Sequence, residues 1–442
     1  MKPFNRPTDL ATAWTEQLPI KKPSMSTSTP GAFQALQAAE SGLLNLKKED
    51  LLRIQRLAQS ACDTHQTFNA REFKTFCSND YLGLAHHPEL VKATQDALGH
   101  LGLGSGASHL ISGHHQAHQN LAERLSGFQK AHIPHAKTFI YSSGYMANLG
   151  AITALCALPQ ASFAEPHALT SIYSAKLNHA SIIDGIRLAS KQCTVKLTVF
   201  EIDHLDALRV QLQGDSAKHK LIICDGVFSM DGNLSPVAEL LDLAHRFDAL
   251  LLIDDAHGFG VLGAQGHGIL EHLNLNSERL VYMGTLSKAA GVMGAFVCAH
   301  ETLSQWIFQK SRPYIYTTAS PPALSVATLK SLDLIEGLEG QHKRAHLNHL
   351  IHVWRDTLKL KHWHMLKSVT PIQAVLVGDN RLCVRLDQEL QAMGYLIPAI
   401  RPPTVPKLGA RLRITFSANH ALEDVQTLAQ VLMDLELRTM SA

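Results

Sequence analysis

Two reactive side chains stand just after two apolar runs of this sequence. An apolar run at 250–253 ends at Asp254, and a second run at 280–283 is followed closely by Lys288. Open α/β sheets bind their ligands beyond the carboxyl ends of parallel strands, so we expect this carboxylate and this amine to share one cleft. A pyridoxal phosphate site requires that pair, because the lysine holds the aldehyde as a Schiff base and the acid keeps the pyridine nitrogen protonated. The pattern therefore predicts a pyridoxal phosphate enzyme with Asp254 and Lys288 at its centre.

Polar clusters after other apolar runs support one shared cleft. Gly144 and Tyr145 open a helical stretch, where backbone N–H groups suit a phosphate and an aromatic ring can stack on another. Thr285 offers a hydroxyl to a phosphate, and we expect His257 to face the phenolic oxygen of the ring or the substrate. The loop 225–232 contains two Asp-Gly pairs and a serine, which is typical of a turn at a strand end.

The composition excludes several classes of protein. The chain has 442 residues, 45% hydrophobic and 18% charged, with a formal net charge of +2. This near-neutral balance gives no electrostatic reason to expect nucleic acid or a membrane as the main partner. Seven scattered cysteines without a C-x-x-C pair fit reduced thiols in a cytoplasmic enzyme. No apolar run reaches the roughly 18 residues that a membrane helix needs.

Histidine is frequent, with 26 residues, and His114-His115-x-x-His118 has a spacing that metal sites use. There is no H-E-x-x-H and no acidic or cysteine ligand at a suitable distance, so we expect solvated histidines on a helix face and no metal. The glycine-rich run 102–106 lacks both a preceding strand and the third glycine of a dinucleotide fingerprint. We interpret it as a tight connection.

The apolar pattern predicts a mainly parallel α/β domain followed by a smaller α+β domain. Continuous apolar runs indicate strands buried on both faces, and these runs lie at 138–141, 171–174, 195–200, 220–224, 250–253, 280–283 and 295–298. Helical patterns are found at 32–60, 147–157, 237–247, 322–360 and 420–437, and further strands near 73–77, 372–377 and 411–416. We therefore predict a disordered extension at 1–31, a helical segment and strand at 32–77, a large cofactor-binding domain at 78–320 and a small domain at 321–442.

Six motifs, in order, resemble the α-oxoamine synthases, which are pyridoxal phosphate enzymes of the aspartate aminotransferase fold, also called fold type I. The motifs are FCSNDYLGLAHHPEL, GLGSGASHLISGHHQAH, DGVFSMDGNLSP, LLIDDAHGFGVLG, GTLSKAAG and YTTASPP. The resemblance runs from about Leu43 to the C-terminus. It implies an acyltransferase that condenses an amino acid with an acyl thioester and releases CO2. It also implies a homodimer with the active site at the subunit interface.

The segments 399–406 and 410–415 narrow this resemblance. They are most similar to the branch of the family that makes 8-amino-7-oxononanoate, in biotin biosynthesis, from L-alanine and pimeloyl-CoA or the pimeloyl carrier protein. One alternative is a branch that uses glycine, such as 2-amino-3-ketobutyrate CoA ligase. A more distant alternative is an inert regulatory subunit that binds pyridoxal phosphate without catalysis.

The resemblance assigns cofactor roles by position. Lys288 matches the Schiff-base lysine, Asp254 the partner of the pyridine nitrogen, and His179 the histidine stacked over the ring and counted as catalytic. Ser229 and His257 match residues that bond the phenolic oxygen of the cofactor. The phosphate contacts match Gly144, Tyr145 and Thr285. Thr317 or Thr318 is expected to reach the phosphate of the neighbouring subunit.

Substrate roles follow from the same resemblance. Arg401 is expected to bind the amino acid carboxylate in a bidentate manner. Asn79 and Thr404 are expected to line the substrate, and Arg53 aligns by spacing with a contact to the acyl chain.

Four residues depart from the family pattern. His109 replaces an arginine or glycine, Tyr145 replaces a phenylalanine, and Ser287 stands where a glycine often precedes the lysine. Phe259 stands where the motif DDAHGTG has threonine. None of these removes a catalytic group, and we expect Phe259 to reshape the entrance for the acyl chain.

Overall fold

The computed structural model describes residues 30–49, 51–159 and 169–440 in two compact units. The first unit comprises the described part of residues 1–61 together with 66–73. It contains helix α1 (Pro30–Lys48) and most of strands β1 (His65–Phe68) and β2 (Arg71–Thr75). The predicted helix at 32–60 is shorter in the structure: α1 ends at Lys48, and Ala58 forms an antiparallel bridge with Phe68. The predicted disordered extension lies, up to residue 29, outside the described residues.

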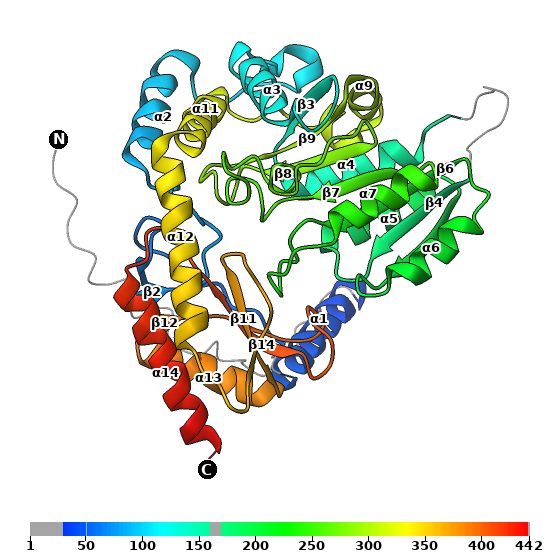
Figure 1. Cartoon of the computed structure of the whole chain (residues 1–442). Helices are drawn as coiled ribbons and strands as arrows, with labels where there is room; N and C mark the ends of the chain where they lie inside the picture. The colour runs from blue at the N-terminus through cyan, green and yellow to red at the C-terminus, as the bar shows by residue number, and fades with distance from the viewer. Residues whose placement is uncertain (1–29, 50, 160–168, 441–442) are drawn as a thin grey trace. The chain divides into compact units, whose positions relative to one another are not determined.

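The second unit, residues 62–65 and 74–442 within its described part, is built on a sheet of seven strands. The strands are β3 (Ala136–Tyr141), β4 (Thr170–Ala175), β5 (Val195–Phe200), β6 (His219–Asp225), β7 (Leu250–Asp254), β8 (Leu280–Thr285) and β9 (Ala295–His300). Their order is β3-β9-β8-β7-β6-β4-β5, and Figure 1 labels all of these strands except β5. Strand β9 is antiparallel to both its neighbours, and the other pairs are parallel. The mainly parallel α/β sheet is therefore confirmed.

Helices cover both faces of this sheet, which explains why its strands are continuously apolar. On one face, Ile223 and Leu252 pack with α4 (Gly144–Cys156), α5 (Ala180–Gln192) and α9 (Glu301–Lys310). On the other face, Ile222 and Leu251 pack with α3 (Gln116–Gln129), α6 (Leu205–Gln213) and α7 (Val237–Arg246). Neighbouring residues of one strand thus enter opposite cores. This part of the unit also contains α2 (Pro88–Leu101) and three short elements: the π-helix η1 (His109–Gly113), α8 (Ile269–His272) and α10 (Arg312–Ile315).

A second sheet of four strands follows in the order β10-β11-β14-β13. Its strands are β10 (His364–Met365), β11 (Ile372–Gly378), β13 (Ala399–Ile400) and β14 (Ala410–Thr415), and β12 (Tyr395–Leu396) pairs with Lys74 and Thr75 of β2. The predicted helical region 322–360 is two helices, α11 (Pro322–Glu336) and α12 (Leu338–Thr357), separated at Gly337. Helix α13 (Asn380–Ala392) packs on this sheet, and α14 (Leu422–Met440) packs against α12.

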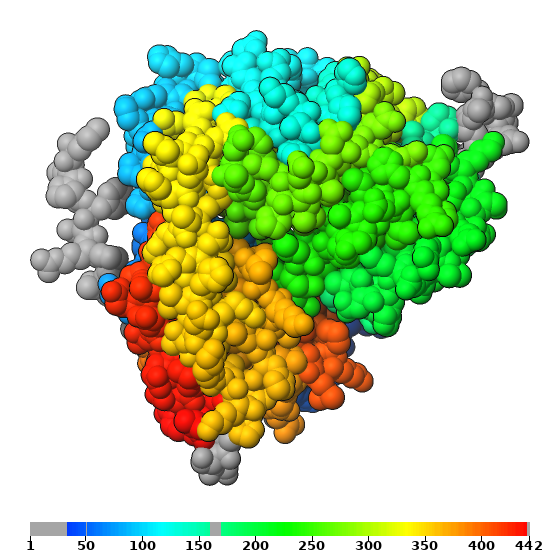
Figure 2. All heavy atoms as spheres, viewed as in Figure 1, coloured from blue at the N-terminus to red at the C-terminus, as the bar shows by residue number. Residues whose placement is uncertain are grey.

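The residues on both sides of the predicted boundary at 321 belong to the same compact unit, so that division stays a prediction. Helix α11 begins there and packs against α2 and α3. Figure 2 shows the yellow spheres of α12 in contact with the green spheres of the large-sheet part on the face in view. No helix among residues 30–49, 51–159 and 169–440 is both long and apolar enough to cross a bilayer. All seven cysteines are free thiols.

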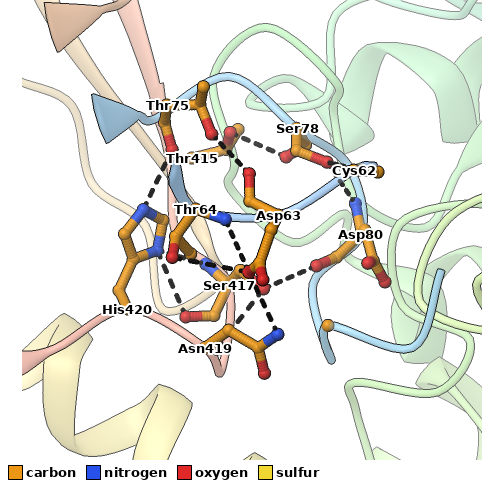
Figure 3. A pocket seen from close by; sticks show the side chains of 11 residues that line it. Cys62, Asp63, Thr64, Thr75, Ser78, Asp80, Thr415, Ser417, Asn419 and His420 are labelled. Carbon is orange, nitrogen blue, oxygen red and sulfur yellow. Dashed lines mark hydrogen bonds between the residues drawn. The ribbon is translucent and has the colours of Figure 1, made fainter. Parts of the chain in front are cut away.

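A small polar pocket joins the segment 75–83 to the chain that follows β14 (Figure 3). Its volume of about 10 Å³ is close to the space that one water molecule needs. Thr415 Oγ1 donates a hydrogen bond to the carbonyl of Ser78 at 2.8 Å, and Ser417 Oγ donates to the carbonyl of Asp80 at 2.8 Å. His420 Nε2 lies 3.0 Å from the carbonyl of Thr75. These bonds hold the loop that carries Asn79 in a fixed position.

We predict that His420 makes stability depend on pH. Its ring is buried, accepts a hydrogen bond from the Ser417 N–H at Nδ1, and stacks on Phe76 at 4.3 Å. Burial lowers the pKa of His420 to about 4, whereas a histidine in an unfolded chain titrates near pH 6.5. Between these values the unfolded chain binds a proton that the folded chain does not. The free energy of unfolding should therefore fall by about 1.4 kcal/mol per pH unit as the pH decreases through this window.

Urea unfolding of wild type and His420→Gln between pH 7 and pH 4.5 tests this. The free energy of unfolding of the variant should depend less steeply on pH, by about 1.4 kcal/mol per pH unit. His86→Gln, a change at an exposed histidine, is the matched control and should keep the wild-type slope. Equal slopes for wild type and His420→Gln would show that His420 titrates normally in the folded protein.

Candidate active site

The carboxyl ends of the central strands surround one cavity of about 220 Å³. Strands β6, β7 and β8 run parallel and in register, so Asp225 lies beside Asp254 and Asp254 beside Met283. The cavity is lined by residues from five strand ends and the loops that follow them: Gly144, Tyr145, Asn148, His179, Ser181, Asp225, Val227, Ser229, Asp254, Ala256, His257, Met283, Thr285, Ser287 and Lys288. The sequence-based expectation that Asp254 and Lys288 share one cleft is therefore met by the geometry.

Asp254 is held as a buried acceptor. Its Oδ2 accepts a hydrogen bond from Asn148 Nδ2 at 2.7 Å, and its Oδ1 accepts one from the N–H of Ala256 at 3.0 Å. Asn148 Nδ2 also donates to Ser181 Oγ at 2.8 Å, and Ser181 Oγ lies 2.8 Å from Nδ1 of His179. This chain of contacts ties the acid on β7 to the histidine that caps the N-terminus of α5.

Asp225 is the second acid at this edge. Its side chain is buried, and Oδ1 accepts a hydrogen bond from the N–H of His179 at 3.3 Å. Burial and the neighbouring charge of Asp254 raise the pKa of Asp225 well above its ordinary value. Two ionised carboxylates side by side in a buried site would repel each other, so the raised pKa favours the protonated form of Asp225 beside Asp254.

Lys288 ends a chain of hydrogen bonds that begins far away in the sequence. Its Nζ lies 2.9 Å from Nε2 of His257, and Nδ1 of that ring lies 2.6 Å from the hydroxyl of Tyr81. The Tyr81 hydroxyl in turn donates to Oδ1 of Asn79 at 3.1 Å. A neutral His257 with its proton on Nδ1 satisfies every contact, since Nε2 then accepts from the Lys288 amine. Burial, followed by the charge of Lys288, lowers the pKa of His257 well below its ordinary value, in agreement with this neutral form.

Arg413 of β14 brings a second buried cation to the same place. Its Nε donates to the carbonyl of Ser229 at 2.6 Å, and its Nη2 lies 3.2 Å from Oδ1 of Asn79. The charge of Arg413 contributes to lowering the pKa of both His257 and Lys288, which places the guanidinium close to the reactive amine. Arg413 lies in the segment 410–415 that narrows the family resemblance, but the sequence alone assigned it no role.

The loop that carries Ser229 is clamped to the smaller sheet. Arg411 forms an ion pair with Asp231, and both residues are largely shielded from solvent. The carbonyl of Gly232 accepts hydrogen bonds from the hydroxyls of Ser368 and Thr370, each at 2.9 Å. Gly232 has a φ of +82°, and a Cβ there would lie 2.2 Å from the carbonyl oxygen of Ile372, so only glycine fits this close approach.

The start of helix α4 forms the anion-binding side of the cavity. Ser143 caps the helix by accepting a hydrogen bond from the N–H of Met146 at 3.3 Å. A Cβ on Gly144 would point toward Met283 and Thr285, at 3.6 Å and 4.0 Å, so the absent side chain leaves a cradle beside the Thr285 hydroxyl. The free N–H groups and the dipole of a helix N-terminus favour a phosphate.

The other residues assigned from the sequence lie outside this cavity. Arg401 is half-buried after β13, and Thr404 is exposed in the turn that follows. Thr318 forms a backbone bridge with Ser108, and Thr317 is half-buried beside it. Arg53 is exposed in the first unit. Their assigned roles stay predictions.

Two sequence-based expectations need correction. Phe259 does not shape an entrance, because it is 1% exposed and packs against Phe128 and Phe296 in the core. His118 is not solvated but fully buried, since its Nε2 lies 2.8 Å from the carbonyl of Ser320 and its Nδ1 accepts from the N–H of His115.

The sequence reasoning also missed several residues of the site. Tyr81 and Arg413 stand within segments that carry the family resemblance, and Asn148 and Ser181 follow closely after Tyr145 and His179, but only their neighbours received roles. The signal available for Asn148 was its position one turn into α4, on the side that faces the strand ends.

Comparison with known proteins decides the family. A family model described as aminotransferase class I and II matches residues 72–432. An 8-amino-7-oxononanoate synthase from Janthinobacterium sp. (strain Marseille) is 46% identical over 397 residues, which cover 90% of this chain and 97% of that protein. The chain belongs to the 8-amino-7-oxononanoate synthase family. The resemblance to the α-oxoamine synthases is thereby confirmed.

Solved structures agree with this family. A serine palmitoyltransferase from Sphingomonas wittichii has a TM-score of 0.79 at 25% identity, over 94% of this chain and 100% of that one. An 8-amino-7-oxononanoate synthase from Francisella tularensis has a TM-score of 0.67 at 28% identity, over 84% of this chain and 99% of that one. Fold type I is confirmed, and pyridoxal phosphate is the cofactor of this family.

The residues present fit that cofactor. The glycine cradle at Gly144 with the Thr285 hydroxyl suits a phosphate, and Lys288 supplies the amine for an aldehyde. Asp254 provides a buried anion for a protonated ring nitrogen. Within the described part of the chain, Oδ1 of Asn148 is a buried oxygen without a partner, so an acceptor in the cavity wall is left for a bound donor.

We predict that Lys288 captures the aldehyde at a lower pH than an ordinary lysine would. Burial lowers the pKa of Lys288 to about 8, against the opposing effect of Asp254 and Asp225. About a quarter of the amine is then neutral at pH 7.5, compared with roughly 0.1% at the ordinary pKa of about 10.4. Pyridoxal phosphate is added back to cofactor-free protein between pH 6.5 and 10, and the absorbance of the lysine-bound cofactor is followed. The rate at which this absorbance appears should rise with pH, with a midpoint near pH 8. Lys288→Ala should show no such absorbance, and a midpoint above pH 10 in the wild type would refute the shift.

Proposed function

We propose that this protein condenses L-alanine with a pimeloyl thioester to give 8-amino-7-oxononanoate, CO2 and the free thiol, the acyltransferase step of biotin biosynthesis. The observation that carries the proposal is the pair of Lys288 and Asp254 facing one cavity at neighbouring strand ends, in a chain of this family. The new carbon–carbon bond joins Cα of alanine to the thioester carbonyl carbon. The thiol leaves from that carbonyl, and the alanine carboxylate leaves as CO2.

Bound pyridoxal phosphate would supply an aldehyde and an electron-accepting ring that stabilises negative charge on Cα of the amino acid. Lys288, Asp254, Thr285 and the N-terminus of α4 would hold it, with His179 at the open side of the cavity and Ser229 and His257 near its phenolic oxygen. The carboxylate of Asp254 accepts hydrogen bonds from Asn148 and from the N–H of Ala256, and these bonds would hold it toward the ring nitrogen.

The Lys288 amine moves the proton at Cα in this proposal. Its pKa of about 8 lets it accept a proton and return it near neutral pH, as efficient acid–base catalysis requires. The bond to Nε2 of His257 holds the amine in place, and the chain through Tyr81 to Asn79 holds the ring of that histidine. These residues therefore act as one unit.

Arg413 is the best-placed group for the carboxylate of the amino acid. Its guanidinium is buried, bonds to the carbonyl of the cavity residue Ser229 and to Asn79, and acts on the charge of Lys288, whereas Arg401 is half-buried after β13. A buried arginine recognises a carboxylate more strongly than a solvated one because water does not compete for its donors. This revises the sequence-based assignment of Arg401.

We propose a homodimer in the cytoplasm. Tyr145 is 42% exposed although it lines the cavity, so a second subunit is well placed to complete this side of the site. The seven free thiols fit a reducing compartment.

The reaction is tested by incubating the holoenzyme with pimeloyl-CoA and L-alanine, glycine or L-serine, and measuring thiol release. L-alanine should give the highest kcat/KM, and acyl-CoAs shorter than pimeloyl-CoA should react more slowly. Lys288→Ala should abolish turnover, because Lys288 is the one lysine among the described residues that line the cavity. Lys92→Ala on the surface of α2 should leave turnover unchanged. A preference for glycine would assign the protein to the glycine-using branch, and a lack of turnover with intact cofactor binding would indicate an inert regulator.

The carboxylate assignment is tested by Arg413→Lys and its matched control Arg401→Lys. Lysine keeps the charge but loses the planar pair of donors, so Arg413→Lys should raise the KM for L-alanine about tenfold or more, equivalent to about 1.4 kcal/mol. The KM for pimeloyl-CoA should change little. A larger rise in Arg401→Lys than in Arg413→Lys would restore the assignment made from sequence.

A further inference from the structure

Three histidine rings gather where the π-helix η1 meets helix α3, outside the cavity of the candidate active site. His109 begins η1, His114 follows its last residue, and His118 lies in the first turn of α3. One ring nitrogen of each lies within 4.8 Å of the others. The Nδ1 atoms of His109 and His114 are 2.9 Å apart. The group differs from the sequence motif His114-His115-x-x-His118, because His109 takes the place of His115.

Tight folding of the chain produces this group. A Cβ on Gly113 would lie 2.0 Å from the carbonyl oxygen of Ala107, so glycine alone allows the chain to double back and place His114 against His109. His115 then caps α3 by accepting a hydrogen bond from the N–H of Ala117 at 3.1 Å. The cap directs the ring of His115 to its own backbone, and His118, one turn later, faces inward.

His109 and His118 offer neutral nitrogen donors, because burial lowers the pKa of both rings. Burial, followed by the neighbouring rings of His118 and His114, lowers the pKa of His109 to about 4, so this imidazole carries no charge at neutral pH. His118 Nε2 donates its proton to the carbonyl of Ser320 at 2.8 Å. Metal-binding histidines usually make such a bond through the nitrogen that does not bind the metal, and it leaves Nδ1 of His118 as the ligand atom.

We propose that His109, His114 and His118 form a binding site for one divalent transition-metal ion of the zinc class. Two ligands of tetrahedral zinc at about 2.0–2.1 Å lie roughly 3.4 Å apart, so the His109–His114 separation needs to open by only about 0.5 Å. An all-imidazole set favours Zn²⁺, Co²⁺, Ni²⁺ or Cu²⁺ over Mg²⁺ and Ca²⁺, which prefer oxygen.

Two rearrangements are required, and both are small. The exposed side chain of His114 turns its nitrogen toward the shared centre. His118 Nδ1 exchanges its hydrogen bond from the N–H of His115 for the metal. A capping bond of this kind is far weaker than a zinc–imidazole bond, so the exchange favours the metal. The fourth position of the ion would face a cavity of about 520 Å³ that the three histidines help to line.

A bound ion would fasten the start of α3 to the segment that carries Thr317 and Thr318. His109 stacks on Tyr314 with ring centroids 4.9 Å apart, His118 bonds to the carbonyl of Ser320, and Ser108 bridges Thr318. The site is thus structural, and it is independent of turnover at Lys288.

The test is metal binding by the holoenzyme after treatment with a chelator and its removal. Titration with Co²⁺ alone, followed by its visible absorption, and with Zn²⁺ alone, followed by calorimetry at pH 7.5, should give one site per chain. His114→Gln and His109→Gln should each weaken binding at least tenfold, and Mg²⁺ should not compete. The exposed His100→Gln in α2 is the remote control and should bind like wild type.

His115→Asn is the local control, because asparagine keeps the helix cap while the ring is removed. Binding that survives in His115→Asn and falls in His109→Gln supports the proposed ligands. Binding that falls in His115→Asn but not in His109→Gln, or that is unchanged in both His109→Gln and His114→Gln, overturns it. Bound cofactor and alanine turnover, measured on the same samples, show that each variant is folded.

Discussion

The structure of the site depends on how two neighbouring acids can be buried together. Parallel pairing of β6 and β7 in register places Asp225 beside Asp254 at the end of both strands. Two negative charges at this separation and burial would be strongly unfavourable, and the raised pKa of Asp225 relieves the repulsion by favouring its protonated form. Asn148 and the N–H of Ala256 donate hydrogen bonds to Asp254, and Lys288 faces it across the cavity. The register of the sheet therefore sets the electrostatics of the site.

The orientation of the reactive amine is imposed from outside the central sheet. Tyr81 and Asn79 come from the loop before α2, and Arg413 comes from the middle of β14. Bonds around the small polar pocket fix that loop to the chain after β14, and the ion pair of Arg411 with Asp231 fixes β14 to the loop of Ser229 (Figure 3). The central sheet supplies the acids and the amine, and the smaller sheet holds the groups that aim them.

This division explains what could be predicted from the sequence. All seven strands of the central sheet were predicted with ends that differ by two residues or fewer, because strands buried on both faces are continuously apolar. Asp254 and Lys288 follow from the rule that ligands bind at carboxyl ends. Arg413 could not be chosen over Arg401 in this way, because that choice depends on how β13 pairs with β14. The break at Gly337 is local, since the N–H of Gly337 bonds to the carbonyl of Asp333 at the end of α11, and helical periodicity does not record such an end.

The residues that depart from the family pattern differ in whether they lie in the core or line the cavity. Phe259 packs against Phe128 and Phe296, so its side chain is part of the core and does not face the cavity. Ser287 and Tyr145 both line the cavity: the Ser287 hydroxyl donates to the carbonyl of Gly294 at 3.2 Å, and the Tyr145 hydroxyl donates to Asp184 on α5. The extra hydroxyls therefore attach the residue before Lys288 and the aromatic ring at the start of α4 to fixed neighbours. Of the four departures, these two line the cavity, so they are the positions at which this chain differs from the family pattern at the site itself.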